Sequence, residues 1–209
     1  LMYQSAKSMD ADIIVQVGDI GIFPDRKNLD RASKYHFIPE DFLLYFNQKK
    51  KVPIPTYFIK GNHEDFDFLE GREGEIVPGL NFIPQRRVMT IEGIRFGALG
   101  GNYSSSYFQA TKLTGYRRRH FTASDIKSIN EQGFDILLSH HGPKTEMLPH
   151  GSTEITDLIR EIKPTHAYHG HHHHFYTTNI GDTTVIGLDK LDNNQGQAVI
   201  LHELNLQNP

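Results

Sequence analysis

The chain has 209 residues, of which 22% are charged, and its formal net charge is -3 at pH 7 when the histidines are neutral. This length predicts one domain with a substantial core, and the negative charge excludes a general attraction to nucleic acid or to membranes. The absence of cysteine excludes disulfides and thiolate metal sites, which leaves His, Asp, Glu and Asn as ligands. Because no apolar run is long enough to cross a bilayer or resembles a signal peptide, we expect a cytoplasmic protein.

The first part of the chain predicts helices that alternate with strands. We expect the end of a helix over residues 1–9 and a buried strand over 13–17. A loop with at most one helical turn follows over 24–39, then a helix over 39–51 and a second strand over 56–59. Acidic residues open the fourth of these segments and Lys49-Lys50-Lys51 closes it, an order that suits a helix dipole. The lysines are therefore interpreted as a helix end and not as a nucleic-acid patch.

The later part of the chain predicts antiparallel strands mixed with further α/β units. After a short helix over residues 65–69, we expect strands over 81–83, 88–91, 94–99, 134–138 and 165–168, and helices over 123–131 and 152–162. Thr122 and Asp125 form a capping-box pattern at the start of one helix. Residues 175–204 predict antiparallel strands with turns at 181–182 and 193–194.

Apolar strands in both parts end close to side chains that could bind a metal. These side chains are Asp19, Asn62, His140, and the pair His171 and His173. Because parallel neighbouring strands end at the same edge of a sheet, we expect the four ends to converge on one pocket. A set of carboxylate, amide oxygen and imidazole suits Mn, Fe, Zn, Ni or Co, and it does not suit magnesium or a structural zinc finger.

Each of these patterns has an alternative interpretation. Gly18-Asp19 and Gly61-Asn62 are also common turn sequences. The four histidines at 171–174 also fit a generic histidine-rich tract or a tag remnant, although their position inside the chain argues against a tag. Residues 116–120 fit either a solvated basic loop or a clamp for phosphate.

Taken together, the motifs resemble those of the calcineurin-like metallophosphoesterase superfamily. In chain order they are Gly18-Asp19, Gly61-Asn62-His63-Glu64, His140 and Gly170-His171-His172-His173. The resemblance implies an α/β fold, a four-layer αββα sandwich of two mixed β-sheets, with residues 1–209 as a single domain. It also implies a dinuclear site for two divalent transition metal ions, with manganese favoured.

The resemblance further implies a role for each matching residue. Asp19 would bridge the two metals, and His63 would meet the phosphate and protonate the leaving group. One metal would be completed by Asn62, His140 and His171, and the other would use His173.

One motif of the superfamily, Asp-x-His on the first strand, does not occur in this sequence. We therefore expect that the chain begins inside the first helix and that a strand precedes Leu1. The second metal would then have only Asp19 and His173 as ligands in this chain.

Finer details are similar to the branch of the superfamily that debranches RNA lariats. The similar segments are residues 95–103, 116–121, 163–164 and 188–190. The absence of cysteines and of a C-terminal extension argues against this branch, so compact bacterial-type relatives of unknown substrate are the safer comparison.

We expect a metal-dependent phosphoesterase, and a phosphodiesterase in preference to a monoesterase. It would hydrolyse a phosphoester with a metal-bound water, and the substrate could be a nucleotide or nucleic acid. Arg117, Arg118 and Arg119 are a local exception to the negative charge and are candidates for substrate binding. The alternative is a catalytically silent member of the fold that serves as a scaffold for a protein partner. The sequence leaves the substrate, the native metal and the oligomeric state open.

Overall fold

The computed structural model describes residues 1–36 and 40–191. The expected turn at Asn193-Asn194 and the end of the predicted antiparallel tail lie outside the described residues. Helices α5 and α6 are the longest in the described part, with 10 residues each. No helix within these ranges combines the length and the apolar character that a bilayer span requires.

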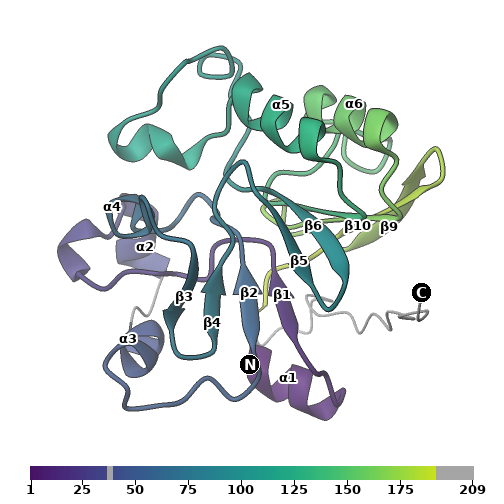
Figure 1. Cartoon of the computed structure of the whole chain (residues 1–209). Coiled ribbons are helices and arrows are strands. Elements are labelled where there is room, and N and C mark those ends of the chain that lie inside the picture. Colours follow the sequence, from purple (N-terminus) through teal and green to yellow (C-terminus); the bar gives the residue numbers. More distant parts are fainter. Residues whose placement is uncertain (37–39, 192–209) are drawn as a thin grey trace.

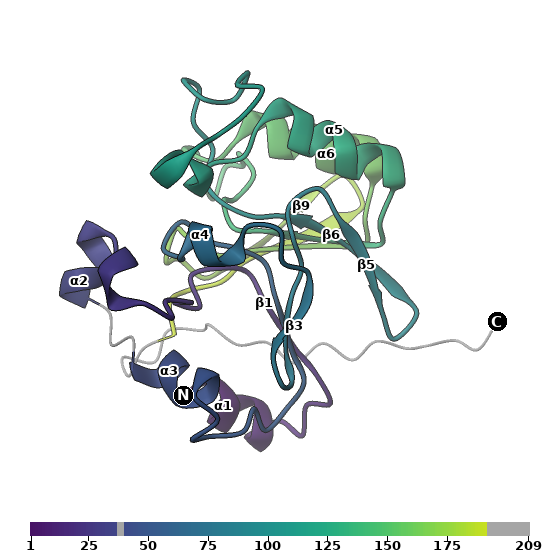
Figure 2. The same cartoon turned by 60° about the vertical axis from the view of Figure 1, so that its left-hand side comes forward.

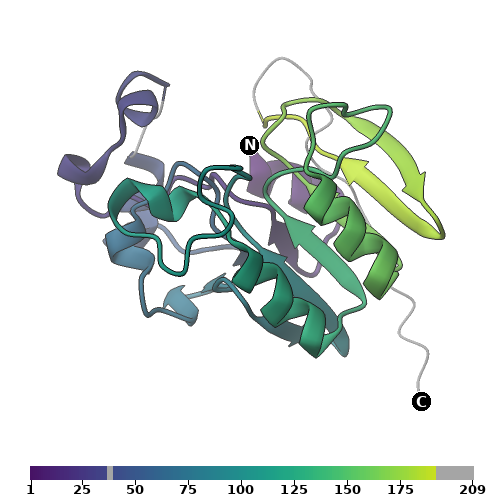
Figure 3. The ribbon, with the colours of Figure 1, turned by 90° about the horizontal axis from the view of Figure 1, so that it is seen from above.

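The described elements form four layers, which are seen edge-on in Figures 1 and 2. Helices α5 (Ala123–Gln132) and α6 (Thr153–Ile162) lie side by side over one sheet, and Figure 3 shows them from above. Helices α1 (Met2–Ser8) and α3 (Glu40–Phe46) lie beyond the other sheet. The expected αββα sandwich of two mixed sheets is confirmed.

The first sheet has four strands in the order β1-β2-β4-β3. Their bounds are β1 (Ile14–Gln16), β2 (Thr56–Phe58), β4 (Leu80–Phe82) and β3 (Gly74–Val77). The first three strands are parallel, and β3 is antiparallel to β4. The sequence did not predict β3, because positive-φ glycines 71, 74 and 79 surround it and hide its short apolar run.

The second sheet has six strands in the order β5-β6-β7-β8-β10-β9. Their bounds are β5 (Val88–Ile91), β6 (Ile94–Leu99), β7 (Ile136–Ser139), β8 (His166–His169), β10 (Thr183–Gly187) and β9 (Tyr176–Ile180). The four central strands are parallel, and the two edge strands are antiparallel to their neighbours. The predicted antiparallel hairpin through residues 181–182 is therefore present.

Three apolar clusters fill the spaces between the four layers. Strand β7 contributes to two of them, because Leu137 packs toward α5 and α6 while Ile136 and Leu138 pack toward the first sheet. All three side chains are buried, which explains why β7 is a continuous apolar run in the sequence. A third cluster between the first sheet and its helices includes Phe42 and Phe58.

Strand β1 is less buried than the sequence predicts. Ile14, Val15 and Gln16 are only half-buried, because β1 is the edge strand of its sheet and has a hydrogen-bonded neighbour on one side only. A hollow of about 1160 Å³ runs along this strand, and it extends past Asp19 to His171.

The lysine run does not close helix α3 as the sequence predicts. The helix ends at Phe46, with no basic residue in its last turn. Gln48 then adopts a left-handed conformation, with φ of 56°, and this turns the chain out of the helix before the lysines. Lys49, Lys50 and Lys51 lie exposed after the helix.

Short helical segments connect the main elements. They are the 3-10 helices η1 (Arg26–Asn28) and η2 (Gly115–Arg119) and the α-helices α2 (Arg31–His36) and α4 (Phe66–Leu69). The sequence predicted a helical turn before residue 39 and a short helix near 65–69, but it did not predict η2 within the polar segment.

Side-chain caps fix the starts of both covering helices. The capping box at α5 is present, since Asp125 Oδ2 accepts a hydrogen bond from the Thr122 backbone N–H at 2.7 Å. At α6, the buried Ser152 Oγ accepts from the Ile155 backbone N–H at 3.3 Å. These caps hold the apolar faces of α5 and α6 in register with the second sheet.

We expect Ser152→Ala to lower the free energy of unfolding by about 1 kcal/mol, because it removes a helix N-cap. Urea denaturation measures the change. Thr153→Ala is the matched control, since Thr153 is the exposed first residue of the same helix. An equal loss in both variants would contradict a capping role for Ser152.

Candidate metal centre

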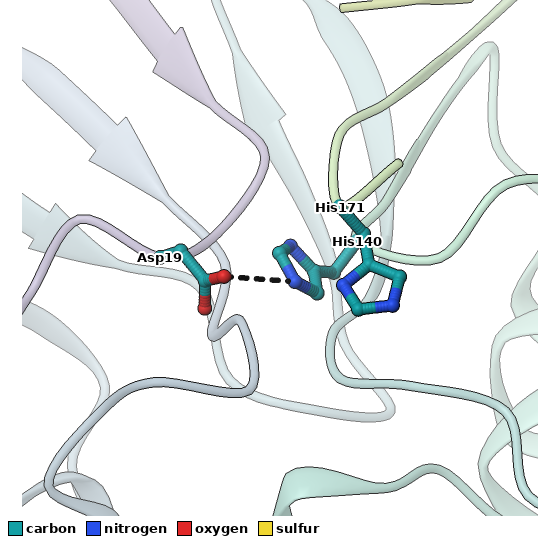
Figure 4. A group of neighbouring side chains, drawn as sticks. All are labelled: Asp19, His140 and His171. Carbon is teal, nitrogen blue, oxygen red and sulfur yellow. Dashed lines mark ion pairs between the residues drawn. The ribbon is translucent and has the colours of Figure 1, made fainter. Parts of the chain in front are cut away.

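The ends of two strands from each sheet meet between the sheets. Asp19 and Asn62 follow β1 and β2 in the first sheet, and His140 and His171 follow β7 and β8 in the second. Ligand atoms of Asp19, His140 and His171 all lie within 4.8 Å of one another. Figure 4 shows the Asp19 carboxylate facing the His140 ring, with the His171 ring beside it. The expected convergence therefore occurs, although the four strands belong to two facing sheets.

The carboxylate of Asp19 is held by the backbone of the neighbouring loop. Its Oδ1 accepts hydrogen bonds from the backbone N–H groups of Asn62 at 2.7 Å and His63 at 2.8 Å. A Cβ atom on Gly61 would lie 2.0 Å from Asp19 Oδ1, so only glycine permits this approach. Burial alone would raise the pKa of Asp19, but His140 and these hydrogen bonds hold it well below its usual range.

Glu64 holds the loop that carries Asp19. Its carboxylate accepts from the backbone N–H groups of Ile20 at 3.0 Å, Gly21 at 3.1 Å and Ile22 at 2.8 Å. Burial and the nearby Asp19 charge raise the pKa of Glu64 to about 8, while the backbone hydrogen bonds act in the opposite direction. Glu64 therefore orients its neighbours, as its place in the motif suggests.

The buried ring of His140 has one nitrogen that is committed to the backbone. Its Nδ1 lies 2.8 Å from the carbonyl oxygen of Val17, which can only accept, so Nδ1 carries the proton. In the neutral ring, Nε2 then offers a lone pair. This nitrogen lies 2.9 Å from Asn62 Oδ1 and 3.3 Å from Asp19 Oδ2.

His171 completes the group. Burial, followed by the neighbouring histidines, lowers the pKa of His171 to about 3. Its ring centre lies 5.0 Å from that of His140, and its backbone is left-handed, with φ of 66°. A left-handed conformation is uncommon for histidine, and it turns this side chain toward the cluster.

These donor atoms fit a divalent transition metal. A carboxylate oxygen, the Asn62 amide oxygen and two imidazole nitrogens converge, and these are donor types that bind such metals. A cation between them would offset the repulsion among their lone pairs. The residues that would hold it are Asp19, Asn62, His140 and His171.

His173 lies apart from this group in the described structure. It is exposed and has φ of 50°, and it lines the hollow along β1 together with Asp19 and His171. Its assignment to a second metal remains a prediction.

His63 has a partner that the sequence did not predict. Its Nδ1 lies 2.6 Å from Asp30 Oδ2, and Asp30 Oδ1 accepts from the Ser33 backbone N–H at 2.7 Å. Burial acts to raise the pKa of Asp30, but these bonds from Ser33 and His63 lower it, so the group is a carboxylate at neutral pH. Asp30 lies 33 residues before His63 in a mixed-charge loop, where no local pattern marks it.

The three consecutive arginines face different surroundings. Arg118 forms ion pairs with Asp67 and Glu70, and the guanidinium of Arg117 lies 5.4 Å from the centre of the Tyr107 ring. Arg119 lines a pocket together with His63. Of the three predicted substrate contacts, Arg119 is thus the one beside a candidate site residue.

Comparison with known families gives one match over most of the chain. A family model described as calcineurin-like phosphoesterase matches residues 1–175. The crystal structure of the Thermus thermophilus protein TT1561 superposes with a TM-score of 0.55 at 14% identity, covering 89% of this chain and 80% of that one. At this identity the superposition supports the fold alone.

Curated relatives include enzymes named for lariat debranching. The lariat debranching enzyme of Schizosaccharomyces pombe is 26% identical over 84% of this chain and 46% of its own length. Lariat debranching enzyme A of Xenopus laevis is 26% identical over 71% of this chain and 34% of its own length. The chain thus spans less than half the length of these two relatives.

We expect purified protein to retain a transition metal, because the four donor groups converge and are of types that bind such metals. Elemental analysis of protein prepared without metal-chelating resin measures it. His140→Gln should lose most of the bound metal, while His150→Gln, which changes an exposed histidine outside the cluster, should not. Less than about a tenth of an equivalent in the parent protein would contradict the site.

Proposed function

This chain belongs to the calcineurin-like phosphoesterase family, and we propose that it hydrolyses phosphate esters with the help of divalent metal ions. The observation that carries the proposal is the convergence of Asp19, His140 and His171, with Asn62 beside them. Bound divalent ions would supply the chemistry that these side chains lack, since they lower the pKa of water and offset phosphate charge. We propose that residues 1–209 form a single domain.

We further propose that two cations bind, with Asp19 between them and manganese as the favoured metal. Asp19 is suited to contact both, because Oδ1 is fixed by backbone N–H groups while Oδ2 faces His140. His173 lines the same hollow as Asp19 and would serve the second cation. A stoichiometry of one ion for each chain would contradict the dinuclear site and leave the first site intact.

His63 is the proposed general acid. A hydrogen bond from its Nδ1 to Asp30 fixes the ring, so Nε2 is the nitrogen that can give a proton to the leaving-group oxygen. The backbone of His63 is fixed as well, since its N–H donates to Asp19 Oδ1. One residue would therefore align the proton donor with the metal-binding carboxylate.

A phosphodiester of the nucleic-acid type is the proposed substrate. Relatives named as lariat debranching enzymes support this choice, and so does the placement of Arg119 beside His63. A guanidinium can form paired hydrogen bonds with phosphate oxygens, so Arg119 could hold a phosphate next to the one that is cleaved.

We expect His63→Ala to lower the turnover of an activated phosphodiester by ~10²- to 10⁴-fold, because a positioned general acid contributes about this much. Metal content should stay unchanged, since His63 is outside the group of converging ligands. Steady-state kinetics with elemental analysis on the same samples measures both quantities. Loss of metal in this variant would make His63 a ligand, and unchanged turnover would remove it from the mechanism.

We expect Asp30→Asn to lower turnover less than His63→Ala, because asparagine can still accept the hydrogen bond but has no charge. Asp30→Ala, which removes the acceptor, should come close to the His63→Ala value. The pH profile of turnover should change in both Asp30 variants, which a purely structural role would not require. Equal activity of Asp30→Ala and the parent would contradict a role in positioning His63.

The scaffold function makes the opposite prediction for the same samples. A protein that keeps its fold, binds no added Mn²⁺ and hydrolyses no phosphate ester would favour a protein-binding role over catalysis. Circular dichroism on the metal-free protein separates this outcome from unfolding.

A further inference from the structure

A second pocket adjoins the metal centre on the side of His63. It is an open hollow of about 370 Å³, lined by Asp30, Arg31, Ala32, Tyr35, His63 and Arg119. This volume falls in the range of small-molecule sites, which is roughly 300–1,000 Å³. Helix α2 supplies one wall and the end of η2 supplies another, so segments far apart in the sequence form it together.

Two cationic side chains in this pocket are available for an anion. The Nε of Arg119 is buried and has no hydrogen-bond partner among the described residues. An unpaired buried donor is uncommon in proteins, and a bound water or ion is one explanation for it. Arg31 is exposed and lines the same pocket, with no ion pair to any described residue.

The carboxylate in the pocket has partners for both of its oxygens. Asp30 Oδ2 is paired with His63 at 2.6 Å, and Oδ1 accepts from the Ser33 backbone N–H. Arg118, by contrast, is engaged by Asp67 and Glu70. The cations that remain available therefore lie beside the proposed proton donor.

The pocket also offers an aromatic ring that packs against no other ring. The side chain of Tyr35 is 78% exposed, and it contacts no other aromatic ring in the described part of the chain. Nucleobases stack on such rings with little dependence on sequence. The two guanidinium groups can bind the phosphate of a nucleotide, and the exposed aromatic ring in the same pocket can stack on its base.

Residue Lys60 connects this pocket to the metal-binding loop. Its Nζ donates to the carbonyl oxygen of Arg118 at 2.5 Å, directly before Arg119, and Lys60 itself comes two residues before Asn62. The Arg119 backbone is fixed further by the Asn102 N–H, which donates to its carbonyl at 2.8 Å. The position of Arg119 is thus coupled to the loop that presents Asn62 and His63.

We propose that this pocket is a nucleotide subsite, which holds the nucleoside portion that leaves when the phosphodiester is cleaved. Tyr35 stacks on the base, and Arg119 and Arg31 bind its remaining phosphate. The inference rests on the proposed function, because it takes His63 as the donor of a proton to the leaving group. It deepens that function by assigning a nucleotide, and not a simple alcohol, to the leaving side.

Isothermal titration of the full chain with adenosine 5′-monophosphate tests the subsite, with ribose 5-phosphate as the probe that lacks a base. Tyr35→Ala should weaken adenosine 5′-monophosphate by roughly 5- to 150-fold, the range expected for one stacked base, and should leave ribose 5-phosphate unchanged. Tyr35→Phe should bind like the parent, since the ring is kept. Arg119→Gln should weaken both probes.

Matched controls for these variants lie outside the pocket. Tyr116→Ala removes an aromatic ring that is 67% exposed and does not line the pocket. Arg72→Gln removes the same charge as Arg119→Gln, but Arg72 does not line the pocket, and its guanidinium lies 4.2 Å from the centre of the Phe68 ring. Neither control should change the affinity of either probe.

Two outcomes would overturn the subsite. One is equal affinity for the two probes together with no effect of Tyr35→Ala, which would leave at most a phosphate site. The other is a loss of affinity in the controls as large as that in the pocket variants. If nucleotide binding follows the expected pattern while the parent hydrolyses no phosphodiester with added Mn²⁺, the subsite stands and the proposed function falls.

Discussion

The candidate site depends on the close approach of two loops, one after β1 and one after β2. A Cβ atom on Gly18 would lie 2.7 Å from the Cα of Gly61, so the two backbones are nearly in contact. This approach lets the N–H groups of Asn62 and His63 reach the Asp19 carboxylate. One set of hydrogen bonds therefore fixes a candidate metal-binding carboxylate, a candidate amide ligand and a candidate proton donor relative to one another.

The charge balance of the site follows from this arrangement. Backbone N–H groups donate to one oxygen of Asp19 but do not neutralise its carboxylate charge. The nearby His171 is neutral because burial lowers its pKa to about 3. The described cluster thus combines the Asp19 carboxylate with imidazole nitrogens and an amide oxygen. A low-dielectric surrounding strengthens the attraction of the carboxylate for a cation.

The sequence predicted the buried strands and the positions of the candidate ligands from local patterns, whereas the four-layer sandwich was expected from the family resemblance. Buried strands such as β7 are continuous apolar runs, and each motif directly follows its strand. The pairing of Asp30 with His63 could not be predicted, since it joins residues 33 apart through a loop without periodicity. The end of α3 was misplaced because the left-handed turn at Gln48, and not the lysines, ends the helix.

The two sheets divide the proposed chemistry between them. The first sheet presents Asp19, Asn62 and His63, and the second presents the imidazoles of His140 and His171. The apolar cluster between the sheets sets the relative positions of these side chains. Because protein interiors are close-packed, a shift of one sheet would also shift the other. The hydrogen bond from His140 Nδ1 to the Val17 carbonyl crosses this interface at 2.8 Å, next to Asp19. The same bond sets the tautomer of a candidate ligand and ties the second sheet to the loop of the first, so sheet packing and ligand geometry are one constraint.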